Sequence, residues 1–548
     1  MPLQKNQVLT LRVERLSSDG SGVAHSPDGE TVFIPGAAPG DEARVRIVKD
    51  CKRYAFGILD EVLTPSPDRI PVDCAVAGPC GGCSLRHLDY AAELRAKQEN
   101  VADAFARIGG LDVPVLPIVG SPEVNRYRNK VQFPVGVDKS GKPCIGFYAG
   151  RTHRIVPCPD CRLQPGVLNE IGNALCAFFA EKGIQPYSEE TGRGLVRHIF
   201  LRRGAHSGQI MVCLVCTRAK LPSAEELCTR LKAQFAEITT ILLNVNAKNT
   251  NVILGTETHT LYGPGYIEDT LCGVPVQLGP LSFYQVNTLA AEQLYGIAAQ
   301  YAQLTPDDLL LDLYCGMGTI GLSMAAHCRE LIGVEIVPEA IESAKANAAR
   351  MGADVAAKSR FFCADAGQAA TRLAAEGLHP DIVMLDPPRK GCDEATLSAV
   401  VRMSPRRVVY VSCNPATAAR DAAWLEQNGY HAEKVQPVDL FPRTRHCEAV
   451  LLLTKLNVER HIEVDVSMDE LDVTAAESKA TYNEIREYVW EHHQLKVSNL
   501  YIAQVKLKHG IIERENYHKA KNENAKQPKC PKEKEDAIVE ALKHFQMI

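Results

Sequence analysis

The stretch from about Leu261 to Lys455 most constrains the fold, because apolar strand-like runs alternate there with helical stretches. Strands separated by helices pair most readily as parallel neighbours joined by crossover connections. The pattern therefore predicts an α/β domain built on a parallel sheet of βαβ units. The whole chain has 548 residues, too long for one hydrophobic core, and should hold three or four domains.

One strand of this region runs into a glycine-rich turn in "LLLDLYCGMGTIGLSMAA". Gly316, Gly318 and Gly321 satisfy the spacing G-x-G-x-x-G, which lets a ligand approach the N-terminus of the following helix. Asp312 precedes the turn, and Glu335 ends the next strand, where a carboxylate can bind ribose hydroxyls. The turn alone fits either a dinucleotide or S-adenosylmethionine.

The strand in "DIVMLDPPRKG" favours S-adenosylmethionine, the methyl donor, over a dinucleotide. It ends in Asp386-Pro387-Pro388, a signature of methyltransferases that act on nucleobases. In the type that methylates amino groups an aromatic residue usually follows the prolines, whereas here Arg389 follows them. Nitrogen methylation is therefore disfavoured.

A further strand, in "VVYVSCNPAT", delivers the thiol of Cys413 to its own end, and Pro415 prevents the strand from continuing. Carbon-5 of uracil is a poor nucleophile until carbon-6 has been attacked, and a thiolate can make that attack. After methyl transfer, a base must remove the proton on carbon-5. In "TRHCEAVLLL", Glu448 stands at the head of the last strand and can be that base.

At these residues the sequence resembles the RNA uracil-5-methyltransferase family, in particular its 23S ribosomal RNA type with a TRAM domain and a 4Fe-4S cluster. The resemblance covers essentially the first 455 residues, with the motifs "FYQVNT", "DLYCGMGTIG", "DPPRKG", "SCNP" and "TRHCE" in order. It implies an S-adenosylmethionine-dependent transferase of EC class 2.1.1 with a Rossmann-like catalytic domain. Its product would be 5-methyluridine in structured RNA, with ribosomal RNA favoured over transfer RNA.

The resemblance also implies roles for individual residues. Four residues are expected to contact the cofactor: Gln285, Tyr314, Glu335 and Asp386. Three residues are expected to act in catalysis: Cys413 as nucleophile, Glu448 as general base, and Asp386. Asp365, in "CADA", is expected near the adenine.

Nineteen cysteines, an odd number, fit reduced thiols and metal ligands better than a disulfide framework. Three of them have the spacing C-x5-C-x2-C: Cys74, Cys80 and Cys83. Cys158 and Cys161 are both candidates for a fourth ligand, and the spacing leaves zinc and an iron–sulfur cluster open. The family resemblance favours a 4Fe-4S cluster with Cys161, which follows His153 and begins "CRLQ". Cys158 is then an extra thiol, and the cluster should have a structural or RNA-positioning role.

Short alternating strands from Val8 to Leu63 predict a small β-barrel, residues 1–64, which resembles the TRAM module. Its basic residues interleave with Tyr54 and Phe56, which fits either a base-stacking surface or a solvated strand face. The basic residues are Arg44, Arg46, Lys49, Lys52 and Arg53. Residues 65–265 follow as an iron–sulfur and central RNA-binding region of α+β type. In it Arg126, Arg128 and Lys130, in "NRYRNK" around Tyr127, could grip phosphate or form a solvated cluster.

Residues 266–457 form the predicted methyltransferase domain, and residues 458–548 a polar helical appendage. In the appendage, Thr474 and Glu477 form a capping box that opens a helix to about His493. A second helix should begin near Ser498, and "KEKEDAIVEALKHF" a third. The appendage is either a nucleic-acid reader or a plain interaction or stability element. Its local positive charge would come from Lys506, Lys508, Lys519, Lys521, Lys526 and Lys529.

The net charge of −5 gives no global nucleic-acid signature, so RNA must be held by local basic patches. No apolar run approaches the ~20 residues of a membrane span, and no secretory signal is recognisable, so we expect a cytoplasmic protein. We also expect a monomer. Three other functions stay open from the residues alone: a transfer RNA enzyme, an RNA-binding protein with an inactive methyltransferase domain, and a dinucleotide-dependent oxidoreductase.

Overall fold

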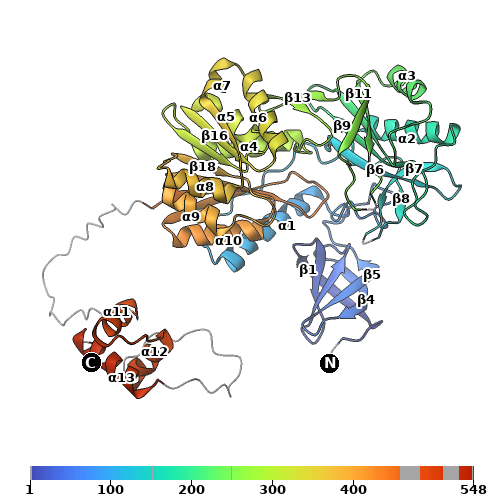
Figure 1. The fold of residues 1–548 in the computed structure, drawn as a ribbon. Coiled ribbons are helices and arrows are strands. Elements are labelled where there is room, and N and C mark those ends of the chain that lie inside the picture. The colour runs from blue at the N-terminus through green and yellow to red at the C-terminus, as the bar shows by residue number, and fades with distance from the viewer. Residues whose placement is uncertain are drawn as a thin grey trace. The chain divides into compact units, whose positions relative to one another are not determined.

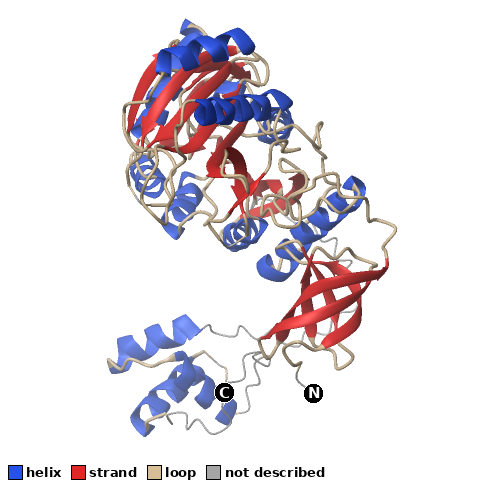
Figure 2. Cartoon of the chain, turned by 90° about the vertical axis from the view of Figure 1, so that its right-hand side faces the viewer, coloured by secondary structure: helices blue, strands red, loops and turns tan. Residues whose placement is uncertain are grey.

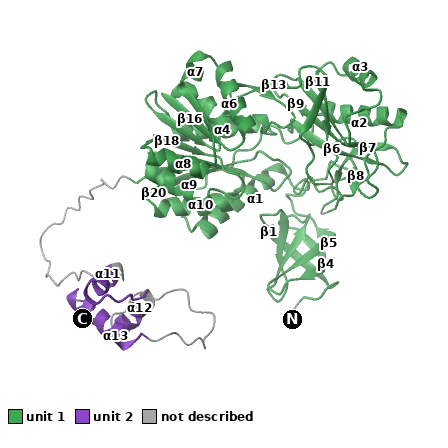
Figure 3. Cartoon of the chain, viewed as in Figure 1, with its two compact units in different colours: residues 1–458 green, residues 459–548 purple. Residues whose placement is uncertain are grey.

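The computed structural model describes residues 3–150, 152–248, 250–456, 482–509, 530–545 and 547. Figure 3 shows the chain divided into two compact units, Met1–Val458 and Glu459–Ile548. None of the described helices is both long and apolar enough to cross a membrane.

The chain begins with a closed β-barrel of strand order β1-β2-β3-β5-β4 (Figures 1 and 2). Its strands are β1 Val8–Leu16, β2 Ser21–His25, β3 Thr31–Pro35, β4 Glu42–Asp50 and β5 Tyr54–Thr64. Side chains alternate along each strand, so Val45 and Ile47 of β4 are fully buried while Arg44 and Arg46 face outward. A small barrel, predicted from short alternating strands, is confirmed.

On the barrel surface, Arg44 pairs with Glu61 at 2.6 Å and Arg46 pairs with Asp60 at 2.9 Å. The charges of both arginines are neutralised by carboxylates on the same face of the barrel. This is expected if the basic residues form a solvated strand face. Tyr54 and Phe56 pack with Phe33 into an aromatic group with ring centroids 5.6, 5.7 and 5.8 Å apart. The stacking of bases on this group stays a prediction.

A second sheet has seven strands in the order β12-β11-β10-β9-β6-β7-β8. Its elements are β6 Lys130–Val137, β7 Pro143–Tyr148, β8 Ile155–Pro157, α2 Gly166–Glu181, β9 Val196–Arg203, β10 Ile210–Cys216, α3 Ala224–Gln234, β11 Ile238–Val245 and β12 Glu257–Tyr262. Helices α2 and α3 share one hydrophobic core with the sheet. A two-stranded hairpin, β13 Ile267–Leu271 and β14 Val274–Leu278, follows.

The third sheet also has seven strands, in the order β17-β16-β15-β18-β19-β21-β20. Its strands are β15 Leu309–Leu313, β16 Glu330–Glu335, β17 Ser359–Cys363, β18 Ile382–Leu385, β19 Arg407–Ser412, β20 Tyr430–Val438 and β21 Glu448–Lys455. The strands from β15 to β19 pair in parallel, and the order reverses at β15 and β18. The predicted α/β fold with a parallel sheet is confirmed for this core.

The prediction of a parallel sheet from Leu261 to Lys455 was wrong at both ends of that stretch. Strands β12 to β14 pair antiparallel outside this sheet, so the parallel alternation begins at Leu309 and not at Leu261. Strand β21 runs antiparallel to both β19 and β20. It does so because the loop 439–447 before it carries no crossover helix, and a short connection returns a strand antiparallel.

Helices cover both faces of this sheet (Figure 1). They are α4 Thr288–Ala302, α5 Thr319–Met324, α6 Pro338–Arg350, α7 Ala353–Lys358, α8 Ala366–Ala375, α9 Glu394–Met403 and α10 Pro415–Gln427, with a 3-10 turn η2 Ala325–His327. Alternate residues of one strand belong to different cores: Leu310 to the core with α4, and Leu309 and Leu311 to the core with α9 and α10.

A helix that follows the first cysteines packs on this same sheet. Helix α1, Tyr90–Asp103, is capped by Asp89 and continues as a π-helical turn η1, Ala104–Gly109. Gly110 ends it in the left-handed conformation, at φ 64°. Helix α1 contacts α10 and β20 and so joins the cysteine region to the catalytic domain.

The C-terminal unit has three described helices, α11 Tyr482–His493, α12 Asn499–Lys508 and α13 Lys532–His544. Ser498 caps α12, so the second and third predicted helices are confirmed. The capping box of Thr474 and Glu477 lies outside the described residues, as do Lys519, Lys521, Lys526 and Lys529.

Two lysines of this unit differ from the prediction of a positive surface. Lys506 is only 2% exposed, because it lies one helical turn after Ile502 on the face of α12 that forms the core. Lys508 is paired with Glu535. The prediction of an exposed positive charge is therefore wrong at Lys506, and the charge of Lys508 is neutralised by Glu535.

Candidate active site

Three predicted catalytic residues meet at one edge of the third sheet. Leu385 of β18 pairs with Tyr410 of β19, and Ser412 of β19 pairs with Ala449 of β21. Asp386 and Cys413 therefore follow two adjacent parallel strands. Because β21 is antiparallel, its first residue, Glu448, reaches the same edge.

The turn that carries Cys413 is a strand-to-helix junction. Asn414 caps α10 by accepting from the N–H of Ala416, and Pro415 stands in the first turn, where no backbone donor is needed. The side chain of Asn414 also donates to the carbonyl of Arg389 at 3.0 Å. The turn is thus tied to the loop after Asp386, and Cys413 is left half-buried between them.

The groups around Cys413 shift the pKa of its thiol in opposite directions. Burial raises the pKa of its thiol, and the carboxyl groups of Glu448 and Asp386 raise that pKa further. The guanidinium of Arg389 lowers the pKa, both by its charge and by a hydrogen bond to the thiol. Arg389 was considered in the sequence only as a replacement for an aromatic residue, and its role beside the thiol was missed.

Both carboxyl groups at this edge are disposed to hold a proton near neutral pH. Burial raises the pKa of Glu448 to about 8, the charge of Asp386 adds to the increase, and Arg389 opposes it. Burial raises the pKa of Asp386 to about 7. A carboxyl group with a pKa near the working pH can take up and release protons efficiently.

The glycine turn lies beside this edge, at the point where the strand order reverses. Gly316 has φ 54°, and a Cβ there would meet nothing within 4 Å, so a ligand can approach the backbone. Glu335 accepts from the N–H of Gly316 at 3.1 Å, and Tyr314 is half-buried with φ 66°. Asp312 instead faces inward and accepts from the N–H of Gly321 at 3.0 Å, so it holds the turn.

The "FYQVNT" loop is held by Asn129, the residue just before β6 of the second sheet. Asn129 donates its side-chain N–H to the carbonyl of Gln285 at 2.7 Å. Phe283, two residues before Gln285, is 73% exposed. This side chain was not singled out from the sequence, and the only sequence signal for it is its place in the "FYQVNT" motif. Asp365 accepts from the N–H of Gln368 and caps α8.

The basic segment 126–130 is only partly free for RNA. Arg126 pairs with Asp160 at 2.7 Å, and Tyr127 is buried and donates to the carbonyl of Pro442 at 3.0 Å. Arg128 and Lys130 are both half-buried. Burial lowers the pKa of Lys130 to about 8, and two nearby arginines lower it as well.

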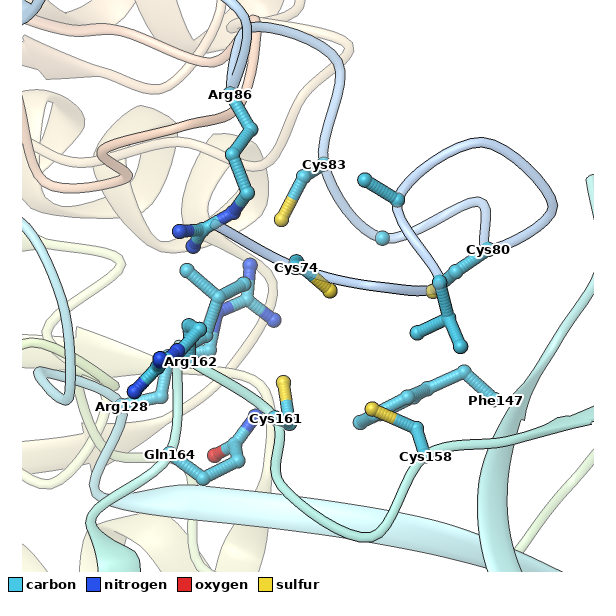
Figure 4. A pocket seen from close by; sticks show the side chains of 14 residues that line it. Cys74, Cys80, Cys83, Arg86, Arg128, Phe147, Cys158, Cys161, Arg162 and Gln164 are labelled. Atoms are coloured by element: carbon cyan, nitrogen blue, oxygen red, sulfur yellow. The ribbon is translucent and has the colours of Figure 1, made fainter. Parts of the chain in front are cut away.

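Five cysteines line one cavity of about 90 Å³ (Figure 4). They are Cys74, Cys80, Cys83, Cys158 and Cys161. The cavity is several times larger than the ~10–15 Å³ that one water requires. Arg86 and Arg128 also line it, and Arg86 donates to Asp73 at 2.7 Å. Among the described residues, no three His, Cys, Asp or Glu side chains are grouped as ligands of a single metal ion.

The structure distinguishes the two cysteines that compete for a fourth ligand position. A hydrogen bond from Cys158 lowers the pKa of the Cys161 thiol, as do the N–H groups of Leu163 and Gln164. The same hydrogen bond, together with burial, raises the pKa of Cys158. Cys161 is therefore the thiol whose surroundings favour the ionised, metal-binding form. His153 is exposed and pairs with Glu189.

Two family models match this chain: tRNA (Uracil-5-)-methyltransferase over residues 207–456 and TRAM domain over residues 2–59. Among similar proteins is one of Halalkalibacterium halodurans, described as an uncharacterized RNA methyltransferase. It is 43% identical over 457 residues, which are 83% of this chain and 99% of the relative. One of Oceanobacillus iheyensis, described in the same words, is 41% identical over 455 residues, 83% of this chain and 98% of the relative.

A solved structure is also similar over most of the chain. It is the Pyrococcus abyssi tRNA (uracil-54, C5)-methyltransferase in complex with S-adenosyl-L-homocysteine. It has a TM-score of 0.65 and 27% identity, and the match covers 81% of this chain and 100% of that one. Together with the barrel, the glycine turn and the strand-end residues, these findings agree on one activity. The chain belongs to the RNA uracil-5-methyltransferase family, enzymes that use S-adenosylmethionine to methylate carbon-5 of uracil in RNA.

Proposed function

We propose that methyl transfer proceeds through a covalent bond between Cys413 and the target uracil. The Cys413 thiolate attacks carbon-6, and the resulting enolate takes the methyl group from the sulfonium at carbon-5, releasing S-adenosylhomocysteine. Glu448 then removes the proton from carbon-5, the bond from Sγ to carbon-6 breaks, and the thiolate leaves. The observation that carries this proposal is the convergence of Cys413, Glu448 and Asp386 at one sheet edge.

The groups around the glycine turn fit S-adenosylmethionine, which supplies the electrophilic methyl group. Gly316 leaves the backbone open to the ligand, and the carboxylate of Glu335 ends β16 beside it. Glu335 would bind the ribose hydroxyls. Tyr314, Gln285 and Asp386 complete the proposed cofactor contacts.

The proposed substrate is 23S ribosomal RNA, modified by a cytoplasmic enzyme. The barrel and the cysteine region add surface beside the catalytic domain, which suits a large folded RNA, and Arg128 and Lys130 offer positive charge to its backbone. Transfer RNA is a second candidate, favoured by the likeness to the Pyrococcus abyssi enzyme, which is a tRNA methyltransferase.

Transfer of a labelled methyl group from S-adenosylmethionine tests the choice of substrate. We expect 23S ribosomal RNA from cells lacking the protein to gain 5-methyluridine at a defined uridine, because its native site is unmodified there. Transfer RNA from the same cells should gain none. RNA from cells that contain the protein is the control, since its site is already methylated. Methylation of transfer RNA alone would contradict the ribosomal assignment.

The cysteine cavity is the proposed site of a 4Fe-4S cluster, held by Cys74, Cys80, Cys83 and Cys161. Four thiolates are the ligands such clusters use, and the cavity is larger than one ion or one water requires. Arg86 and Arg128 add positive charge beside the thiolates. When bound, the cluster would hold together the loops that meet at the cavity. A structural role is expected because methyl transfer involves no electron transfer.

Metal analysis of two serine variants tests this ligand set. Cys161→Ser should lower the iron and sulfide found per chain after anaerobic purification, because it removes a proposed ligand whose anionic form is stabilised by the N–H groups of Leu163 and Gln164. Cys158→Ser is the matched control, three positions earlier and in the same cavity, and should keep both near wild type. Zinc without sulfide in the wild-type protein would refute the cluster, and equal losses in both variants would refute the choice of Cys161.

A further inference from the structure

The loop that leads into Glu448 is held by residues far away in the sequence. Between β20 and β21, four consecutive carbonyls of residues 440–443 accept hydrogen bonds from distant donors. The donors are Asn287 to Leu440 at 3.1 Å, Lys97 to Phe441 at 3.2 Å, Tyr127 to Pro442 at 3.0 Å, and the N–H groups of Ser84 and Leu85 to Arg443 at 3.1 Å. Arg443 itself is in the left-handed conformation, at φ 68°. The path of this loop is therefore set from outside it.

A buried group of charges forms the strongest part of this attachment. The ammonium of Lys97, on α1, donates to Glu93 at 2.7 Å and to Asp439 at 2.8 Å. Lys97 is 1% exposed, and both carboxylates are 0% exposed. Glu93 also accepts from the N–H of Arg443 at 2.7 Å, and Tyr90 donates to Asp439 at 2.9 Å. A buried carboxylate that loses its cation stays uncompensated, so removing Lys97 should strongly destabilise Asp439 in this place.

The attachment point is one residue from the strand position opposite Glu448. Val438 of β20 pairs directly with Glu448 of β21, and Asp439 follows Val438. The side chain of Cys447, next to Glu448, also lies 3.6 Å from the carbonyl of Val438. A shift of Asp439 would therefore move the backbone of Glu448 relative to Cys413, which sits on the neighbouring strand end.

We propose that Lys97 is a positioning residue for proton removal: by holding Asp439 and Phe441 it keeps Glu448 within reach of carbon-5 of the uracil. This inference rests on the proposed role of Glu448. Because Lys97 is only 1% exposed, it should contact neither substrate nor cofactor and should act only through the loop 439–447. Its loss should affect the breakdown of the covalent intermediate more than its formation, because Cys413 is held by the separate junction of β19 and α10.

The test compares the trapped intermediate in Lys97→Met, Glu448→Gln and wild type. Each protein is mixed in single turnover with labelled substrate RNA and S-adenosylmethionine, and the RNA bound covalently to protein is followed on denaturing gels. Lys97→Met should release methylated RNA about 100-fold more slowly, since a 1 Å misplacement of a catalytic group can cost about that factor. Its affinity for RNA should stay at the wild-type value. Arg95→Met is the matched control, because Arg95 lies on the same helix but pairs with Asp68 at the surface.

A purely structural role for Lys97 predicts a lower melting temperature with no change in the ratio of adduct to product. That result would overturn the inference. If Lys97→Met does not fold, Asp439→Asn is tested instead by the same ratio of covalent adduct to released product. This variant keeps the size of the side chain and removes its charge. Glu448→Gln separates the two proposals. If it traps no adduct, the assignment of the base fails and this inference with it; if it traps adduct while Lys97→Met turns over normally, only the positioning role fails.

Discussion

Replacing Cys413 with alanine is expected to lower RNA methylation by roughly 10⁴-fold or more, the scale seen when an enzyme loses its nucleophile. Without a thiolate, carbon-6 is not attacked and carbon-5 does not become nucleophilic. Methyl transfer to RNA is measured in single turnover with enzyme in excess. Binding of RNA should change little, since Cys413 contributes one half-buried side chain to the contact surface.

A substrate containing 5-fluorouridine makes the same prediction visible as a bond. Fluorine replaces the proton that the base removes, so the wild-type adduct should persist on denaturing gels, while Cys413→Ala should form none. Cys228→Ala, at a half-buried thiol on α3, is the control and should trap RNA like wild type. A persistent adduct in Cys413→Ala, or normal methylation by it, would contradict the proposed attack.

Glu448→Gln is expected to transfer the methyl group once and then to retain the RNA as a covalent adduct. The amide cannot take the proton from carbon-5, and the loss of a general base commonly costs about 10²–10⁴-fold. Denaturing gels should therefore show methylated RNA attached to the variant with the natural substrate. Glu433→Gln, at an exposed position of β20, serves as the control. Release of product by Glu448→Gln at the wild-type rate would refute its role as base.

The pH dependence of adduct breakdown follows from the same residue. Burial raises the pKa of Glu448 to about 8, and a base acts only when deprotonated. The rate of breakdown should therefore rise with pH and reach half its maximum near pH 8, and Glu448→Gln should show no such rise. Cys413 does not contribute to this profile, because its sulfur is bonded to the ring in the adduct. A rate that falls as pH increases would contradict the assignment.

Local patterns were sufficient for much of the catalytic domain. Apolar runs of β15, β18 and β19 were recognised as strands, and each motif residue was expected at the end of its strand. Parallel strands bring their carboxyl ends to one edge, so Asp386 and Cys413 could be placed together before any contact was known. Glu448 was also expected there, although its strand proved to be antiparallel.

Contacts between distant segments could not be predicted in this way. The guanidinium of Arg389 beside Cys413 depends on how two loops fold over the sheet edge. The burial of Lys506 depends on which face of α12 meets the other helices. Periodicity describes neighbours along the chain, whereas these positions are set by packing between elements.

By itself, the sequence determined the α/β catalytic domain, the barrel, and the strand-end residues that suit methyl transfer to uracil, because these follow from local periodicity and short spacings. Only the tertiary structure decided that the backbone N–H groups of Leu163 and Gln164 face the thiol of Cys161, and that Lys97 bonds Asp439 across 342 positions of sequence. The physical reason is that hydrogen bonds and burial depend on distances in space, which are known only once the sheets and helices have packed.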